Sequence, residues 1–380
     1  MRTTHRIERD QTYRSSVSPV YLATLETDPL LEDPDDYLHR SYLATMSSNI
    51  SRKAPFERDG SLTDIPDNKL ESIPADILNE NHNNNDYTKV IVEGPPHLQN
   101  KLRELINEFS TIFKASVQGQ PAKLKPFKLQ VDHSKWHTPA NRLRPRSVSR
   151  EQATEIKKLL QILLDNHIIE ISDDSYYSHA FLVPKPNGKW RMVLDFKNLN
   201  SATTNYYHWP IPNIRDMLQR VGESRPRFFA VFDLTSGYYQ APIDVESRNY
   251  TAFLTQEGLY RWLRLPMGLT GAGSYFQHSL TTQVLTGLIQ SGVELYLDDC
   301  MVHANTWEQF LERLRTVFLR FRDSGVTLNP SKCILGLSQV EYVGHTISKD
   351  GLHFTRDKLD SVLNFPRPQT KRQVKSFLGL

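Results

Sequence analysis

Two adjacent aspartates, Asp298 and Asp299, interrupt an otherwise apolar segment of the chain. Residues 293–304 read V-E-L-Y-L-D-D-C-M-V-H-A. Aspartate is disfavoured within strands, and an unpaired buried carboxylate is costly, so the pair predicts a tight turn at the tip of a β-hairpin. Paired carboxylates on a hairpin suit Mg²⁺, which binds a few carboxylates together with substrate phosphates. This segment alone leaves an acidic surface turn open as the alternative.

A third aspartate, Asp233, ends a second apolar segment. Residues 228–232 read F-F-A-V-F, and Asp233 is followed by the turn-like Thr235-Ser236-Gly237. If the two strands are neighbours in one sheet, three carboxylates converge and carry about −3 of charge, which requires cations nearby. Two metal ions about 3.5–4 Å apart would supply them and would clamp the attacking and leaving oxygens of a phosphoryl transfer.

Both aspartate segments resemble motifs of one enzyme family. Tyr296-Leu297-Asp298-Asp299 resembles the Tyr-x-Asp-Asp box of reverse transcriptases, and residues 232–238 resemble the segment that carries their first catalytic aspartate. Further matching segments follow in the family's order: residues 190–196 with Leu199-Asn200, residues 265–270, residues 343–348 and residues 376–380. Over roughly residues 98–380, the chain is similar to the polymerase of gypsy-like long-terminal-repeat retrotransposons.

The resemblance implies an RNA-directed DNA polymerase, a nucleotidyltransferase that adds deoxynucleotides to a primer 3′-hydroxyl on an RNA or DNA template. Its cofactor would be two Mg²⁺ ions, with Mn²⁺ as a substitute. The implied metal ligands are Asp233, Asp298, Asp299 and the backbone of Leu234. We expect Asp298 to matter more than Asp299.

The resemblance also implies residues that contact the nucleotide. Lys185 and Arg191, on a hairpin with the turn K-P-N-G-K, match residues that contact the incoming triphosphate. Tyr238 matches the aromatic gate that excludes ribonucleotides, because its ring leaves no room for a 2′-hydroxyl; a core tyrosine is the alternative. Met267 and Gly268 would line the nucleotide pocket.

The residues implied to contact the primer or template are Tyr296, Val343 and Gly344. Two positions depart from the family pattern. Met267 stands where Phe is common, and Gly271-Ala272-Gly273 replaces Asn-Ala-Pro. A flexible Met still fills a pocket, whereas two glycines weaken a helix start.

Both helices and strands must position these residues. Hydrophobic periodicity predicts helices over 97–113, 149–166, 270–291 and 306–324. Strands are predicted over 124–131, 326–334 and 340–347, and hairpins over 179–195 and 250–263, the first at an Asn-Gly turn. The fold class is therefore α+β. The resemblance implies a right-hand polymerase with palm, fingers and only the start of a thumb.

Charge is distributed unevenly along the 380 residues. Residues 1–95 hold 10 Lys+Arg against 17 Asp+Glu, whereas residues 101–150 hold 11 against 3. The basic stretch predicts a polyanionic partner, nucleic acid or membrane lipid, with a solvated basic face as the alternative. We divide the chain into an acidic disordered linker (1–95), a basic region with a fingers helix (96–167), the fingers and palm (168–347) and a truncated thumb or connection (348–380).

Several function classes are disfavoured. The sequence contains no run of about 18 apolar residues, so no membrane span is predicted. The two cysteines form no zinc-binding pattern. We expect an intracellular, cytoplasmic protein, located in a virus-like particle if it is part of a complete element. The alternative function is an inactive retroelement remnant that only binds nucleic acid. A group-II-intron or telomerase-like enzyme fits the motifs less well.

Overall fold

The computed structural model describes residues 87–142, 144–145, 147–184, 190–205, 207–354 and 363–378. Its first sheet has the strand order β1-β10-β5-β9-β8, and all neighbours are antiparallel except β1 and β10. The strands are β1 (Ile91–Val92), β5 (Phe228–Asp233), β8 (Val293–Tyr296), β9 (Asp299–Ala304) and β10 (Ile334–Leu337). The two aspartate-bearing strands predicted from the sequence are thus neighbours.

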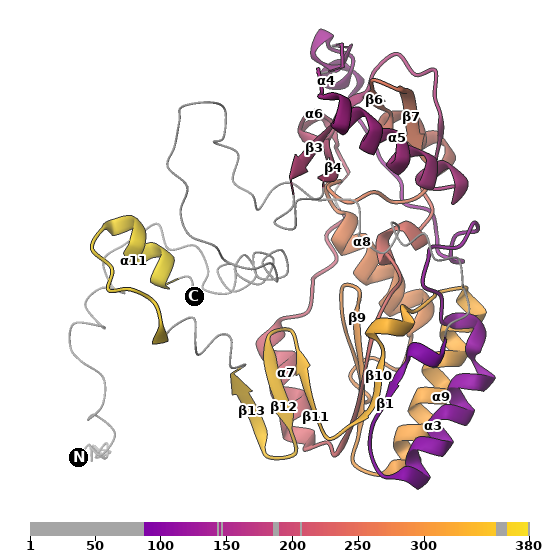
Figure 1. Cartoon of the computed structure of the whole chain (residues 1–380), viewed down its shortest axis with the longest axis vertical. Helices are drawn as coiled ribbons and strands as arrows, with labels where there is room; N and C mark the ends of the chain where they lie inside the picture. Colours follow the sequence, from indigo (N-terminus) through magenta and orange to yellow (C-terminus); the bar gives the residue numbers. More distant parts are fainter. Residues whose placement is uncertain are drawn as a thin grey trace, which may run out of the picture.

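The first sheet is covered on both faces (Figure 1). α9 (Trp307–Ser324) contacts β5 and β9, and α3 (Pro96–Glu108) contacts β1 and β10. On this face Phe232 packs against Phe318 of α9, with ring centroids 5.4 Å apart. Phe229 and Met301 belong to a second core cluster, which includes residues of α7 (Ile214–Ser224). Because successive side chains of a strand point to opposite faces, the strands contribute to two cores, one on each side of the sheet.

The second sheet has the order β2-β7-β6-β3-β4 and lies above the first in Figure 1. Its strands are β2 (Ile169–Ile171), β3 (Ser178–Pro184), β4 (Trp190–Asp195), β6 (Phe253–Thr255) and β7 (Gly258–Trp262). α5 (Arg150–Asp165) contacts β2 and β4 and begins with a capping box between Ser149 and Gln152. α4 (His133–Trp136) and α6 (Lys197–Ala202) contact each other beside this sheet.

Three smaller elements complete the described chain. β11 (Gln339–Tyr342), β12 (His345–Ser348) and β13 (Gly351–Phe354) form a third sheet, whose first strand contacts β5. α8 (Ala272–Ser279) continues into a π-helical turn, Leu280–Val284, and lies between the first two sheets in Figure 1. α11 (Lys371–Leu378) is the last described helix. None of the described helices is long and apolar enough to cross a membrane.

Several predicted elements differ from the structure, and the strand expected over 340–347 is divided into β11 and β12 by a turn at Val343-Gly344. Residues 124–131 form only isolated bridges at Phe127 and Val131, because side chains accept several of their backbone N–H groups, such as Ser247 Oγ from Leu129 N at 2.9 Å. The helix predicted over 270–291 ends at Val284. Most of 326–334 is not a strand, because the short 3₁₀ helix Pro330–Lys332 precedes β10.

The predicted domain boundaries remain a prediction. Residues 1–86, the greater part of the expected linker, lie outside the described residues. The expected region 96–167 contacts two sheets, since α3 packs on the first sheet whereas α5 packs on the second. Of the expected thumb, residues 355–362 and 379–380 lie outside the description.

Candidate active site

The predicted carboxylates meet at one end of the first sheet. In the β5–β9 ladder Asp233 lies directly opposite Asp299, and in the β8–β9 ladder Tyr296 lies opposite Asp299. Only Leu297 and Asp298 therefore connect β8 to β9, as a two-residue hairpin turn. The three side chains are partly exposed. The strand register thus brings Asp233 beside Asp299, with Asp298 in the adjoining turn, whereas the expected meeting of all three side chains around metal ions remains a prediction.

The turn itself is strained. Leu297, at its first central position, has φ +56°, a conformation that favours glycine. Such a backbone persists only where the surrounding structure holds it, and strain of this kind clusters at functional sites. Here the strained residue directly precedes Asp298, and its side chain is buried.

Asp233 is paired with a cation from the chain. Lys332 Nζ lies 3.2 Å from Asp233 Oδ1 and 3.4 Å from Oδ2. The segment before Lys332 is held beside β5, because Asn329 N donates to Asp233 O at 2.9 Å. Among the described residues, no group of three or more His, Cys, Asp and Glu side chains is arranged to hold a metal ion. In this structure the lysine thus offsets part of the charge that a metal ion would otherwise balance.

Asp298 approaches the segment that follows Asp233. A Cβ at Gly237 would lie 3.3 Å from Asp298 Cβ and 3.1 Å from Phe276 Cζ, so only glycine permits this close approach without a shift of its neighbours. The next residue, Tyr238, is partly exposed and stacks on Phe276, with ring centroids 5.0 Å apart and 18° between the planes. The predicted gate residue therefore lies beside the carboxylates, with its ring held in one orientation.

The predicted nucleotide-pocket loop is held by an asparagine of the matching 190–200 segment. Asn200 Nδ2 donates to Gly268 O, and Asn200 Oδ1 accepts from Thr270 N, both at 2.8 Å. Gly268 has φ +92°, so glycine is required there. Met267 is partly exposed, as is Arg191 on β4. Lys185 lies outside the described residues.

The predicted primer-contacting residues form a second turn against the hairpin. Val343 and Gly344, with φ +44° and +74°, connect β11 to β12. Val343 is buried in one cluster with Tyr296 and Leu297. Tyr296 is 0% exposed, and burial, with a smaller contribution from Asp299, raises its pKa to about 12. Its side chain lies in the core, so its contact with a primer remains a prediction.

Two residues beside the site were not singled out from the sequence. Tyr342 donates its hydroxyl to Asp299 O at 3.1 Å and joins the third sheet to the aspartate hairpin. Lys332 follows the turn signal Asn329-Pro330, which places it in a loop but does not reveal that the loop ends at Asp233. Only the tertiary pairing of β10 with β5 brings them together.

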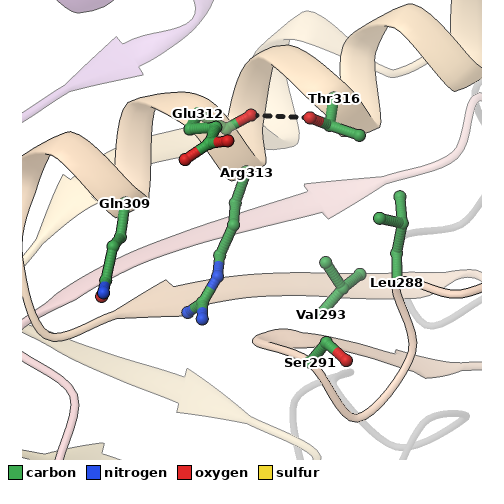
Figure 2. Close-up of a pocket in the computed structure, with 7 residues that line it drawn as sticks. All are labelled: Leu288, Ser291, Val293, Gln309, Glu312, Arg313 and Thr316. Atoms are coloured by element: carbon green, nitrogen blue, oxygen red, sulfur yellow. Dashed lines mark hydrogen bonds between the residues drawn. The ribbon is translucent and has the colours of Figure 1, made fainter.

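A pocket of about 270 Å³ lies elsewhere, at the opposite end of β8 (Figure 2). Val293 at the start of β8 lines it, together with Leu288, Ser291, Gln309, Glu312, Arg313 and Thr316. In Figure 2 Arg313 extends from α9 toward β8, and its Nη1 donates to His303 O at 2.6 Å. The pocket is separate from the carboxylates, which lie at the Tyr296 end of the strand.

Sequence comparisons identify relatives of this chain. Residues 183–347 match the family described as reverse transcriptase (RNA-dependent DNA polymerase). The chain is 31% identical over 308 residues to the retrovirus-related Pol polyprotein from transposon 412 of Drosophila melanogaster, a match that covers 79% of this chain and 24% of the relative. It is 26% identical over 325 residues to the transposon Tf2-3 polyprotein of Schizosaccharomyces pombe, covering 84% and 23%. The chain thus spans about a quarter of these relatives.

Solved structures share the fold. A foamy viral protease-reverse transcriptase in complex with double-stranded DNA superposes with a TM-score of 0.64 at 22% identity, covering 77% of this chain and 50% of that one. The foamy viral protein in complex with an RNA/DNA hybrid gives 0.63 at 21% identity, covering 77% and 38%. The expected α+β, right-hand polymerase fold is confirmed.

Proposed function

Because this chain carries a reverse transcriptase domain related to those of retrotransposon Pol polyproteins, we propose that it acts as an RNA-directed DNA polymerase. The observation that carries the proposal is the register of Asp233 opposite Asp299, with Asp298 in the two-residue turn between β8 and β9. We further assign the domain to a gypsy-like element, on the motifs described above. Its partners would be RNA and DNA template-primers and deoxynucleoside triphosphates.

The donor set fits divalent magnesium. Carboxylate oxygens are hard ligands of the kind Mg²⁺ binds, and Mn²⁺ accepts the same ligands. Asp233 and Asp298 would be the principal ligands, with Asp299 and the backbone of Leu234 beside them. When bound, two such ions would activate the primer hydroxyl and stabilise the charge on the phosphates. Lys332 would have to release Asp233 for a metal ion to take its place.

The protein's own residues would position the nucleotide. Tyr238, held against Phe276, would lie under the sugar and exclude a 2′-hydroxyl. Met267 and Gly268 would line the base pocket on a loop fixed by Asn200. Lys185 and Arg191 would bind the triphosphate, since guanidinium and ammonium groups pair strongly with phosphate oxygens. Val343 and Gly344 would lie next to the primer end.

A basic surface supports binding of a nucleic acid. Residues 123–150 contain eight Lys+Arg and one acidic residue, and all the basic side chains described there are exposed. Rings interleave with them, because Arg142 Cζ lies 4.5 Å from the Tyr176 ring centroid and His137 stacks on Tyr176 at 4.4 Å. Basic side chains that neutralise phosphates provide sequence-independent affinity, and aromatic faces add stacking.

Primer extension by the purified chain tests the proposal. The substrate is oligo(dT) annealed to poly(rA), with dTTP and either Mg²⁺ or Mn²⁺. We expect the primer to lengthen only when the metal ion is present. Binding of the template-primer without extension under either metal would contradict the proposal and favour the inactive remnant that the sequence leaves open.

A further inference from the structure

Gln277 of α8 is a buried polar residue that contacts the tip of the aspartate hairpin. It is 1% exposed. Its Oε1 accepts from Leu297 N at 2.7 Å, and its Nε2 donates to Leu295 O at 3.2 Å and to Thr281 Oγ1 at 3.3 Å. One side-chain amide therefore bonds the backbone on both sides of Tyr296, at the end of β8.

The bond to Leu297 N provides an acceptor for a buried backbone N–H of the turn. Leu297 has φ +56°, and its side chain is 7% exposed, so its N–H points into protein rather than into water. A buried backbone donor without an acceptor is strongly unfavourable. Gln277 supplies that acceptor from outside the hairpin, and in doing so favours the strained conformation over the relaxed alternatives available to a leucine.

The neighbouring residue links the same helix to the gate tyrosine. Phe276 stacks on Tyr238, and its Cζ would lie 3.1 Å from a Cβ at Gly237, where Asp298 Cβ also approaches within 3.3 Å. Consecutive residues of α8 thus contact the turn that carries Asp298 and the ring beside it. A displacement of the Leu297-Asp298 backbone would move the carboxylate relative to both.

We propose that Gln277 is a positioning residue that fixes the Leu297-Asp298 backbone and thereby orients the Asp298 carboxylate for phosphoryl transfer. This inference rests on the proposed polymerase function. Gln277 makes no contact with substrate in this scheme, and its effect passes through the hydrogen bonds to Leu297 and Leu295.

Three variants separate the two hairpin bonds from the rest of the environment. Gln277→Met keeps similar bulk and removes both bonds. Gln277→Glu keeps an acceptor for Leu297 N but loses the amide donor to Leu295 O. Thr281→Val is the control, because it removes only the bond that leads away from the hairpin.

Two readouts are measured for each variant. The first is hydrogen–deuterium exchange of the peptide that contains Leu297, which reports the N–H bond whether or not the chain polymerises. The second is primer extension, resolved into kcat and KM for dTTP, with the template-primer Kd measured separately. Thermal unfolding confirms that each variant is folded.

We expect Gln277→Met to speed exchange at the tip at least tenfold and to lower kcat by about 10–100-fold, the scale expected for a misplaced catalytic group. Template-primer Kd should change less than about threefold, since the Gln277 side chain is buried. Gln277→Glu should keep most of the exchange protection and part of kcat, and Thr281→Val should match wild type.

Unchanged exchange at Leu297 in Gln277→Met would overturn the proposal, as would faster exchange with an unchanged kcat. Equal losses in Gln277→Glu and Gln277→Met would contradict the role of the Leu297 bond. If the wild-type chain does not extend primers, the polymerase function itself fails, and the exchange measurement still decides whether Gln277 holds the turn.

Discussion

At the scale of single residues, Tyr238 is the side chain whose surroundings most narrowly define its role. Its ring lies flat against Phe276 and next to Gly237, where Asp298 approaches. A ring with freedom to rotate could yield to a 2′-hydroxyl, whereas a stacked ring resists displacement. The stacking on Phe276 therefore supports the proposed gate role of Tyr238, which the sequence motif alone gives only by resemblance.

Replacing Tyr238 should alter the choice of sugar. We expect Tyr238→Ala to reduce the preference for dTTP over UTP by on the order of tenfold or more, because steric exclusion is lost. Tyr238→Phe is the matched control and should retain the preference, since it keeps the ring. The ratio of kcat/KM for the two nucleotides in primer extension measures the effect. Equal selectivity in wild type and Tyr238→Ala would rule out the gate.

A second residue-scale prediction concerns His303, a histidine buried in β9. It is 5% exposed, and neither ring nitrogen has a hydrogen-bond partner among the described residues. Burial, with the nearby Arg313 and Arg220, lowers its pKa from 6.5 to about 4. Arg220 is itself paired with Glu294, through Nη2 to Oε2 at 2.8 Å. The folded state therefore holds the imidazole neutral, and the unfolded chain binds a proton more readily.

The sign of the pH effect follows from this lowered pKa. Between pH 6.5 and about 4 the unfolded state binds the extra proton, so the stabilising contribution is present above pH 6.5 and is lost as the pH falls toward 4. The full loss is roughly 3 kcal/mol of unfolding free energy. His303→Leu should flatten this part of the pH dependence in urea unfolding. A slope identical to that of wild type would show that another group causes it.

At the scale of elements, the helices were predicted most accurately where hydrophobic periodicity and capping residues mark them in the local sequence. α5 and α9 begin within a residue of the predicted starts, because Ser149 and Thr306 cap them and their apolar stripes repeat at helical spacing. The β5 and β8–β9 strands were predicted from short apolar runs ending in aspartate. Their pairing needed the resemblance, since apolar runs do not specify neighbours.

The wrong secondary-structure predictions occur where tertiary contacts override the local sequence preference. The apolar residues of 124–131 are buried, as in a strand, yet several backbone N–H groups of the segment donate to side chains of distant segments. The chain after Val284 leaves the helix because Gly287 and Gln290 adopt positive φ. The contacts of Lys332, Tyr342 and Gln277 with the site depend on strand order, which no local pattern encodes.

The basic stretch 123–150 is expected to bind the template-primer. Arg142→Ala removes an exposed charge that lies over Tyr176. We expect weaker template-primer binding by several-fold and a slope of log Kd against log[salt] shallower by about 1. Arg315→Ala on α9 is the control, since it also removes an exposed arginine near an aromatic ring, Phe109. Equal effects of the two substitutions would assign the binding to net charge alone.

At the scale of the whole molecule, the first sheet, the third sheet and α8 meet at the aspartate hairpin. The first sheet supplies the aspartates, and the third contacts the hairpin that carries Asp298 and Asp299 through Tyr342 and Val343. α8, which lies between the first two sheets in Figure 1, contacts the hairpin tip through Gln277 and Tyr238 through Phe276. Parts of the chain that are far apart in sequence therefore share one site. The fold was predictable from the order of the motifs, whereas this convergence was visible only in the structure.

Single substitutions of the three carboxylates test the proposed metal-binding site. Primer extension is measured for Asp233→Asn, Asp298→Asn and Asp299→Asn, with Asp323→Asn as a control at an exposed position on α9. We expect a loss of kcat of at least about 100-fold for Asp233→Asn and Asp298→Asn, a smaller loss for Asp299→Asn and none for the control. Activity near the wild-type level in Asp233→Asn or Asp298→Asn would contradict a catalytic role of these carboxylates.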